Sequence, residues 1–203
     1  MNLTVRQPEP CEFMPADYFR RLAPGEMFSG DAPLEIDLGC GDGTFLLAMA
    51  REFPERRFLG VERLLGRVRK VCRNARRENL DNLKVLRLES LYTVEWLLPP
   101  RSVQRLHLLF PDPWPKARHH KRRLVRAEFL AAVAQVLVPG GELLFKTDHP
   151  GYFEWAEEEI AAFPGLAVRA WPEDAFFYPE TDFERQWNAE GKVPQRLRAV
   201  VPG

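Results

Sequence analysis

The 203-residue sequence predicts an α/β fold with a mostly parallel sheet and helices on both faces. Short apolar runs alternate with segments of helical periodicity, and the first run leads straight into a glycine-rich turn that opens a helix. Alternation of this kind is typical of βαβ units, whose crossover helices lie on the sheet. The sequence therefore predicts one domain, residues 34–203, preceded by an appendage, residues 1–33.

The expected elements follow one another in order and would make a seven-stranded sheet. The predicted strands are 34–38, 57–61, 84–88, 103–110, 142–147, 166–171 and 193–201. The predicted helices are 15–22, 43–53, 64–78, 123–137 and 152–163. Pro139, Gly140 and Gly141 are expected to stop the fourth of these helices. The polar segment 172–192 is expected to be mobile or to face a substrate.

Charge is balanced overall but unevenly distributed along the chain. The 29 Lys and Arg residues offset the 29 Asp and Glu residues, so bulk charge does not hold this protein on nucleic acid. Seven basic residues nevertheless lie between Arg63 and Arg77, a second basic block runs from Lys116 to Arg126, and acidic residues collect in 154–159. A single basic run is most often a solvated helix face, and two such runs alone do not identify a nucleic-acid surface.

Several protein classes are disfavoured. No apolar run approaches the roughly 20 residues that span a bilayer, and acidic residues interrupt the first residues, so we expect a cytoplasmic protein without membrane contact. Cys11, Cys40 and Cys72 are too far apart for a CxxC site, and they indicate reduced thiols. His119 and His120 lack a set of metal-ligating partners, so no metal is expected. The sequence leaves the oligomeric state open.

The strand 34–38 ends in a glycine-rich turn that is typical of a nucleotide-type cofactor site. Glycines at 39, 41 and 43 let the backbone approach a ligand where side chains would block it. A dinucleotide fingerprint is G-x-G-x-x-G, and here the third glycine comes one residue early. The spacing favours a methyltransferase site over that of an NAD-dependent oxidoreductase.

Four acidic residues lie on or after the first three predicted strands. Glu62 closes the strand 57–61 about 20 residues beyond the glycine turn, where a carboxylate can accept both ribose hydroxyls. Glu89 follows the third strand and is expected near the adenine edge. Glu35 and Asp37 share one face of the first strand by the period-2 alternation, and the residues alone do not rank them.

The segment Leu108–Arg123, Leu-Leu-Phe-Pro-Asp-Pro-Trp-Pro-Lys-Ala-Arg-His-His-Lys-Arg-Arg, is the least ordinary of the chain. It resembles the signature of the bacterial tRNA (guanine-N7)-methyltransferases, the TrmB family. Gly-Val-Glu62, Phe-Lys-Thr-Asp148 and Thr181-Asp-Phe-Glu184 follow in the order and approximate spacing of that family, so the resemblance covers nearly all of residues 34–201. The resemblance implies a class I, Rossmann-like S-adenosylmethionine methyltransferase fold. It also implies an enzyme that methylates N7 of the variable-loop guanine, position 46, of tRNA.

The resemblance also implies site residues by position. Asp112 is implied as the catalytic carboxylate. The implied S-adenosylmethionine site, taken with the glycine turn, comprises Glu35, Asp37, Gly39, Gly41, Glu62, Glu89 and Asp112. The implied substrate-binding residues are Lys116, Asp148, Thr181, Asp182, Phe183 and Glu184. Asp37 replaces a common glycine of the family and Glu89 a usual Asp or Asn, so Glu35 and Asp37 are both retained as the cofactor carboxylate.

The predicted reactive loop suits methyl transfer to a base. Pro111, Pro113 and Pro115 fix φ at alternate positions and limit the entropy lost when a base docks. The basic side chains expected to contact RNA phosphates are Arg118, Lys121, Arg122 and Arg123. Trp114 has two equal interpretations, stacking on an extruded base or packing beneath the loop. Asp148 has a second interpretation as the N-cap of the following helix.

Two other functions remain as alternatives. A small-molecule S-adenosylmethionine methyltransferase would share the glycine turn and Glu62 but has little use for a basic, proline-braced loop. A tRNA-binding module would keep the fold and hold tRNA without transferring a methyl group. The NAD-dependent oxidoreductase is disfavoured by the glycine spacing and by the lack of a clear Tyr-Lys or His arrangement.

Overall fold

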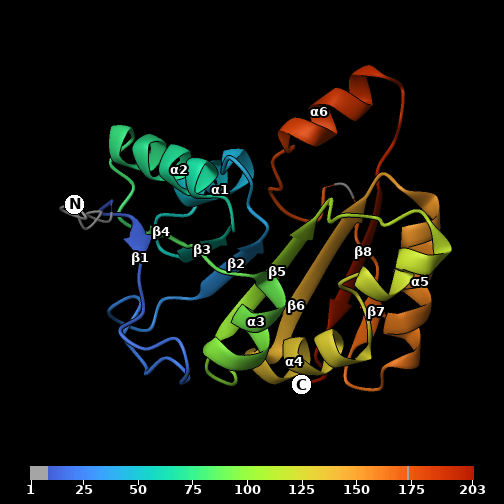
Figure 1. Ribbon diagram of the computed structural model, residues 1–203, viewed down its shortest axis with the longest axis horizontal. Helices are drawn as coiled ribbons and strands as arrows, with labels where there is room; N and C mark the ends of the chain where they lie inside the picture. Colours follow the sequence, from blue (N-terminus) through green and yellow to red (C-terminus); the bar gives the residue numbers. More distant parts are fainter. Residues whose placement is uncertain (1–8, 173) are drawn as a thin grey trace, which may run out of the picture.

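A single sheet of eight strands runs through the computed structural model, which describes residues 9–172 and 174–203. The strand order is β1-β4-β3-β2-β5-β6-β8-β7, and all pairs are parallel except those made by β8 with β6 and β7 (Figure 1). The strands are β1 (Glu12–Phe13), β2 (Leu34–Leu38), β3 (Arg57–Val61), β4 (Leu83–Leu86), β5 (Val103–Leu109), β6 (Leu137–Thr147), β7 (Ala167–Arg169) and β8 (Gln195–Val200). The expected mostly parallel α/β fold is confirmed.

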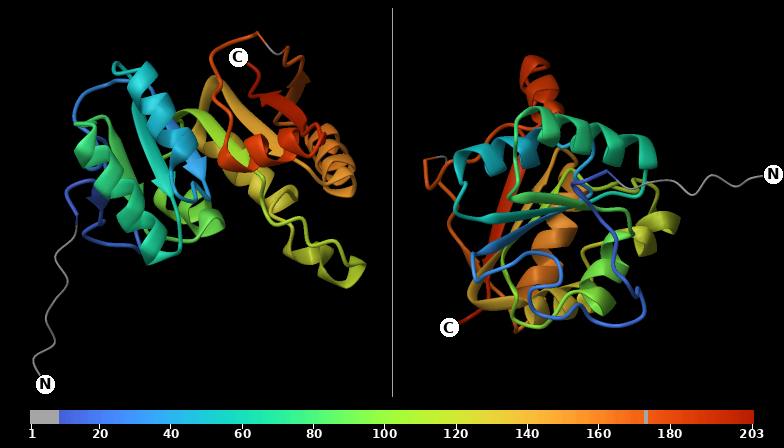
Figure 2. Two further views of the ribbon diagram at one scale, coloured as in Figure 1. Left: turned by 90° about the horizontal axis from the view of Figure 1, so that it is seen from above. Right: turned by 90° about the vertical axis from the view of Figure 1, so that its left-hand side faces the viewer.

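Helices cover both faces of the sheet. The α-helices are α1 (Thr44–Glu52), α2 (Leu65–Arg77), α3 (Ser90–Tyr92), α4 (Ala127–Val136), α5 (Pro150–Ala162) and α6 (Asp182–Ala189). A π-helical turn, η1 (Thr93–Leu97), follows α3, and a 3-10 helix, η2 (Ala117–Arg122), precedes α4. Figure 2 shows α1 and α2 on one side of the sheet and α3 and α5 on the other. No helix in the described part of the chain combines the length and apolar character that crossing a bilayer requires.

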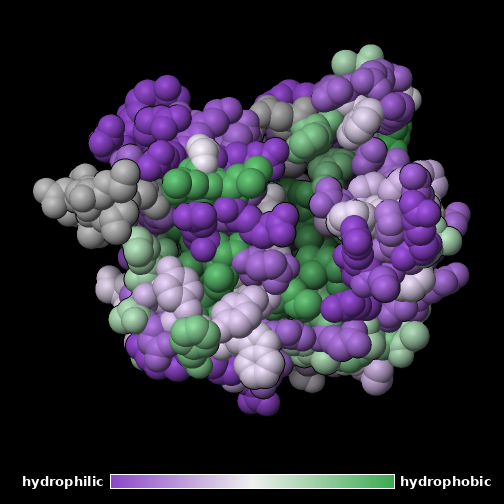
Figure 3. Space-filling model, viewed as in Figure 1, coloured by the Kyte–Doolittle hydropathy of each residue, from purple (hydrophilic) through white to green (hydrophobic). Residues whose placement is uncertain are grey.

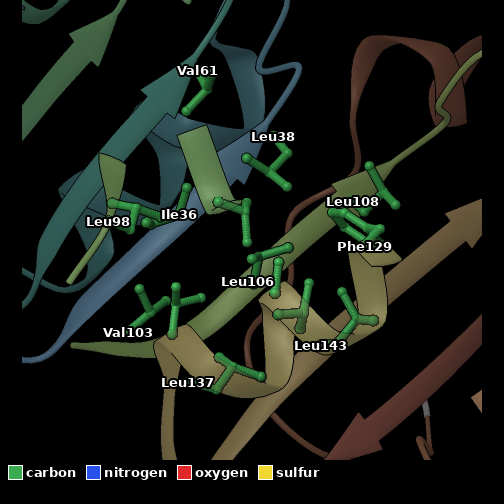
Figure 4. Close-up of a cluster of buried hydrophobic side chains, with 14 of the residues drawn as sticks. Ile36, Leu38, Val61, Leu98, Val103, Leu106, Leu108, Phe129, Leu137 and Leu143 are labelled. Carbon is green, nitrogen blue, oxygen red and sulfur yellow. The ribbon is translucent and has the colours of Figure 1, made fainter. Parts of the chain in front are cut away.

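The strand pattern divides the core into two layers. Phe58 of β3 packs with Met49 and Val71 under α1 and α2, whereas the next residue, Leu59, faces the opposite layer. Figure 4 shows that opposite layer, to which β2, β3, β5, β6 and α4 contribute side chains. Each such large apolar side chain contributes roughly 1.5 to 3 kcal/mol by burial, so both layers hold the parallel strands in register.

The strand order reverses between β2 and β5, which are parallel neighbours although two βα units separate them in sequence. β3 and β4 extend the sheet on one side of this point, and β6 and β8 extend it on the other. In open α/β sheets ligands bind at such a switch point, beyond the carboxyl ends of the strands. The fold therefore places the ends of β2, β3, β4 and β5 around one ligand site.

The N-terminal segment differs from the prediction. The sheet has an eighth strand because β1 pairs with β4, with Glu12 opposite Val85. Residues 15–22 form no helix; the guanidinium of Arg21 instead donates to the carbonyl oxygens of Leu98 and Glu95. These long-range hydrogen bonds hold the segment in an irregular conformation, which the local sequence does not indicate. The boundary at residue 33 stays a prediction, and residues 1–8 lie outside the described residues.

Two later segments also differ from the elements that were predicted. The helix expected at 123–137 begins at Ala127 and ends at Val136, before the Pro-Gly-Gly sequence, which lies inside β6. β6 tolerates Pro139 because its pairing with β5 is irregular between Val103 and Arg105. The segment 172–192, expected to be mobile or to face a substrate, contains the helix α6. Thr181 and Glu184 begin that helix with a capping box, a sequence signal that would have identified it.

Candidate active site

A cavity of about 890 Å³ opens at the switch point of the sheet. The glycine turn, the ends of β2, β3 and β5, the loop after β5 and the start of α6 all contribute to its lining. Its volume lies within the roughly 300 to 1,000 Å³ of small-molecule sites. The residues singled out from the sequence that line it are Asp37, Gly39, Gly41, Glu62, Glu89, Asp112, Trp114, Arg122, Thr181 and Phe183.

The glycine turn joins β2 to α1 in a conformation that other residues rarely adopt. Gly39, Gly41 and Gly43 have φ values of 81°, 58° and 84°. A Cβ atom on Gly43 would lie 2.7 Å from a methyl group of Val71, so this glycine also lets α1 pack against α2. The amide of Gly39 donates to the carbonyl oxygen of Val61, which ties the turn to the end of β3.

Three of the predicted acids meet at this rim. Asp37 is 3% exposed, and burial, followed by the charge of Glu62, raises its pKa to about 7. The carboxylate of Glu62 accepts from the backbone amide of Leu64 at 2.8 Å and lies 3.6 Å from Arg67. Glu89 caps α3 by accepting from the amide of Tyr92 and also lines the cavity. A partly protonated Asp37 is a group that a cationic ligand would stabilise in its charged form.

Glu35 lies two residues before Asp37 on the same face of β2. It is outside the cavity lining and does not join these acids. Its carboxylate accepts from Arg56 at 2.7 Å and lies 3.0 Å from Nε2 of His107. Burial alone raises the pKa of Glu35, but the hydrogen bonds from His107 and Arg56 and the charge of Arg105 outweigh it and lower the pKa to about 2. The direct cofactor contact implied for Glu35 is therefore not supported, because its oxygens are used inside the fold.

His107 and Tyr178 were missed by the sequence analysis. Burial lowers the pKa of His107, so the ring is neutral, donates Nε2–H to Glu35 and accepts at Nδ1 from the Tyr178 hydroxyl at 2.8 Å. Phe45 of α1 packs against both rings at about 4.9 Å. The available signal was a histidine in the apolar strand 103–110, but its partner lies 71 residues away in sequence.

The loop after β5 places Asp112 and Trp114 at the cavity. Asp112 is exposed, and the flanking Phe110 and Trp114 have positive φ values of 51° and 45°. The guanidinium of Arg122 lies 4.9 Å from the centre of the Trp114 ring, and His119 contacts the ring edge-on. Trp114 thus faces the cavity rather than packing wholly beneath the loop, which favours the stacking interpretation.

Arg123 is not a phosphate contact, because it is 3% exposed. Its guanidinium donates to the carbonyl oxygens of Pro113 at 3.0 Å and Gly151 at 2.9 Å and lies over the ring of Trp155. It therefore joins the proline-braced loop to α5. The other basic residues of the prediction, Arg118, Lys121 and Arg122, are exposed.

The predicted substrate residues are only partly brought together. Thr181 and Phe183 line the cavity, along with Gln186 of α6. The exposed Lys116 and Asp148 lie outside its lining, and the side chain of Asp182 lies outside the described part of the structure. The N-cap of α5 is His149, whose ring accepts from the amide of Tyr152, so capping does not explain Asp148.

Glu184 points into the protein and does not contact the cavity. Its carboxylate accepts from Lys146 of β6 at 2.5 Å and from the amide of Thr181 at 3.3 Å, and both charged side chains are buried. The ammonium of Lys146 also lies 4.8 Å from the centre of the Tyr178 ring. The implied role of Glu184 is corrected to a structural one: it anchors α6 and thereby Thr181 and Phe183 at the cavity.

The three cysteines are free, as expected, and all three are buried. The sulfur atoms of Cys11 and Cys72 lie 3.1 Å apart in a hydrogen bond, which joins the N-terminal segment to α2. Within residues 9–172 and 174–203, no three His, Cys, Asp or Glu side chains gather as a metal-binding group.

Comparison with known proteins gives matches over most of the chain. A family described as "Putative methyltransferase" matches residues 31–197. The tRNA (guanine-N(7)-)-methyltransferase of Halorhodospira halophila is 39% identical over 170 residues, 81% of this chain and 73% of that protein. The enzyme of the same name from Limosilactobacillus fermentum is 35% identical over 98% of this chain and 94% of its own length. The structure of the 16S rRNA methyltransferase KamB is 21% identical, with a TM-score of 0.62 over 84% of this chain and 88% of that one, and shares the fold.

The buried ion pair of Lys146 and Glu184 yields a stability prediction. Lys146→Met leaves the carboxylate buried without a counter-charge, which lowers the free energy of unfolding by about 3 to 5 kcal/mol. The double variant Lys146→Met with Glu184→Met recovers most of that loss, because neither charge remains unpaired. Urea denaturation measures both. Lys192→Met, in the exposed pair with Glu190, is the control and costs less than about 1 kcal/mol; an equal cost for Lys146→Met contradicts the structural role.

The two acids of β2 are expected to affect stability with opposite pH dependence. Asp37 ordinarily titrates at 3.8 but at about 7 in the fold, so its contribution to the unfolding free energy falls as pH rises between these values and is constant above. Asp37→Asn therefore gains stability over the native protein across that window. The pKa of Glu35 is lowered from its ordinary 4.5 to about 2, so its carboxylate stabilises the fold above pH 4.5, and this stabilisation is lost as pH falls through 2. Glu35→Gln is therefore less stable than the native protein at neutral pH. Denaturation without ligand from pH 2 to 8 tests both; a pH-independent difference for Asp37→Asn contradicts its assignment.

Proposed function

Because the chain belongs to the family of tRNA (guanine-N(7)-)-methyltransferases, we propose that it transfers the methyl group of S-adenosylmethionine to N7 of a tRNA guanine, at variable-loop position 46. The observation that carries the proposal is a shared cavity. The glycine turn, the acids beside it and the loop after β5 that carries Asp112, here called the Asp112 loop, all line this cavity. A tRNA substrate also agrees with the predicted cytoplasmic location and with the predicted single catalytic domain, residues 34–203.

The residues around the glycine turn fit S-adenosylmethionine. Glu62 ends β3 at the cavity, where its carboxylate can accept from the ribose hydroxyls. Gly39 and Gly41 would let the backbone approach the ligand closely, and Glu89, which also lines the cavity, would meet the adenine edge. Asp37, with a pKa near 7, would be ionised by a cationic ligand, which this cofactor is. When bound, the cofactor supplies an electrophilic methyl group on a sulfonium centre.

The loop after β5 provides what the acceptor base needs. Guanine N7 carries a lone pair and loses no proton on methylation, so the transfer needs orientation rather than a general base. Holding two reactants in line can contribute roughly 7 to 11 kcal/mol of a barrier. Trp114 supplies a ring for the base to stack on, and Asp112 accepts from the guanine N1–H and N2 amino edge or stabilises the cationic product. Thr181 and Phe183 line the same cavity and would border the base site.

Exposed cations beside the cavity would hold the tRNA backbone. Arg118, Lys121 and Arg122 of η2 are assigned to phosphates, with Arg122 also covering Trp114. Lys116 and Asp148 stay proposed contacts at exposed positions beyond the cavity lining. Phosphate contacts release counterions, so tRNA affinity is expected to fall steeply with salt.

The first test is transfer of labelled methyl groups from S-adenosylmethionine to unmodified tRNA, with the site mapped by cleavage at N7-methylguanine. A single modified variable-loop guanine is expected. Asp112→Ala lowers kcat by roughly 10²-fold or more, because a polar contact to the reacting base is lost, and Asp112→Asn also loses most turnover. Asp81→Ala, an exposed aspartate outside the cavity, is the matched control and keeps native turnover.

Other outcomes separate the alternatives. Methylation of free guanosine or GTP without methylation of tRNA favours a small-molecule methyltransferase. tRNA binding without methyl incorporation favours a binding module. Near-native turnover of Asp112→Asn contradicts the role of this carboxylate while leaving the methyltransferase activity in place.

A further inference from the structure

The outer face of α2 is a continuous basic surface to which the proposed function assigns no role. Seven exposed cations, six on α2 and one just before it, form what is here called the α2 basic face: Arg63, Arg67, Arg69, Lys70, Arg73, Arg76 and Arg77. We propose that this face is a second RNA-binding surface, which binds the phosphates of the tRNA backbone outside the target nucleotide. The proposal rests on the proposed function and identifies a part of its substrate contact.

The charges of this face are mostly not neutralised within the protein. Three of its cations have an acidic oxygen within 4.0 Å: Lys70 with Asp42 at 2.9 Å, Arg67 with Glu62 at 3.6 Å, and Arg76 with Glu9 at 4.0 Å. In residues 9–172 and 174–203, no such pair is found for Arg63, Arg69, Arg73 and Arg77. A face that serves solubility alone would mix both signs, and α2 contains no acidic residue.

The spacing of the cations works against the helix. Arg69, Arg73 and Arg77 follow one another at four-residue intervals, so they are neighbours on one surface. Like charges at this spacing destabilise a helix by roughly 0.2 to 0.5 kcal/mol per pair. The helix is held by its buried side, which includes Val68 and Val71. A bound polyanion would remove the repulsion that the fold leaves in place.

The α2 basic face is continuous with the cavity. Arg63, Arg67 and Lys70 line the cavity on the side of β3, while Trp114 and Arg122 line it on the side of β5. From there the 13 residues of α2 extend about 20 Å outward at 1.5 Å per residue. Figure 3 shows the hydrophilic surface over α2 at the upper left. An RNA with a guanine in the cavity therefore meets cations on both sides, η2 on one and α2 on the other.

The acidic residues of the chain favour this path for the RNA. Glu154, Glu157, Glu158 and Glu159 lie on α5, which packs on the face of the sheet opposite to α2. Since the net charge of the chain is zero, its electrostatic field is set by this separation and not by an overall excess. The phosphate backbone of the RNA is attracted toward α2 and repelled from α5.

The test compares double variants in the full-length protein. Arg69→Ala with Arg73→Ala removes two unpaired cations of the α2 basic face, and alanine keeps the helix because it is the best helix former. Arg69→Lys with Arg73→Lys keeps the charge. Arg20→Ala with Arg169→Ala removes two exposed cations that lie outside the cavity lining and outside α2 and η2.

Fluorescence anisotropy with unmodified tRNA between 50 and 200 mM salt measures Kd and its salt dependence. For the alanine pair we expect the slope of log K against log salt to shrink by about 1.5 to 2, and Kd near 0.1 M salt to rise roughly tenfold or more. KM for tRNA rises, whereas kcat at saturating tRNA, the Kd for S-adenosylmethionine and Tm stay native. The lysine pair and the Arg20 and Arg169 pair keep the native slope.

Each result decides between the proposals. A native slope and Kd in the alanine pair overturn the α2 surface while methylation of tRNA by the native protein still supports the proposed function. Equal losses in the alanine pair and the Arg20 and Arg169 pair also overturn it, because they indicate bulk charge alone. A slope change in the alanine pair with no methylation by the native protein supports the surface and contradicts the proposed function.

Discussion

Buried charges on one face of β2, β5 and β6 must be neutralised inside the protein, and the position of the site depends on how this is done. On that face α1 and α2 pack over β3 and β4, and the segment leading from β7 into α6 contacts β5 and β6. Tyr178 bonds to His107, which bonds to Glu35, and Glu184 bonds to Lys146. These partners hold the segment, so the same contacts that satisfy buried charge also bring α6 to the cavity.

The cavity consequently has two halves with different supports. The cofactor half is made by local sequence, because a strand, a glycine turn and the acid at the end of the next strand fall there through the parallel topology alone. The base half depends on distant contacts. Arg123 binds carbonyl oxygens of the Asp112 loop and of α5, and Lys146 anchors α6. Such cross-links tie the loop that carries Asp112 to α5, and α6 to β6, which suits chemistry that depends on alignment.

The charge distribution gives a balanced protein two cationic surfaces beside one cavity. A net charge of zero argues against generic attachment to nucleic acid, yet α2 and η2 concentrate positive charge where a nucleic acid would enter. Neither basic run is interpretable alone in the sequence, because each matches an ordinary solvated helix. Their common border with the cavity is what distinguishes them, and that border is a property of the tertiary structure.

The sequence by itself determined the features that depend on neighbouring residues: the strands 34–38 and 57–61, the glycine turn, the place of Glu62 at the rim and the family signature in the Asp112 loop. The alternation along the strand placed Glu35 and Asp37 on one face, but it did not show how deeply each side chain is buried. Only the tertiary structure decided that Asp37 meets the cavity, that Glu35 and Arg123 are enclosed, and that β1 completes the sheet. The physical reason is that burial and hydrogen-bond partners come from elements far along the chain, such as His107 for Glu35, 72 residues away, and local periodicity carries no information about them.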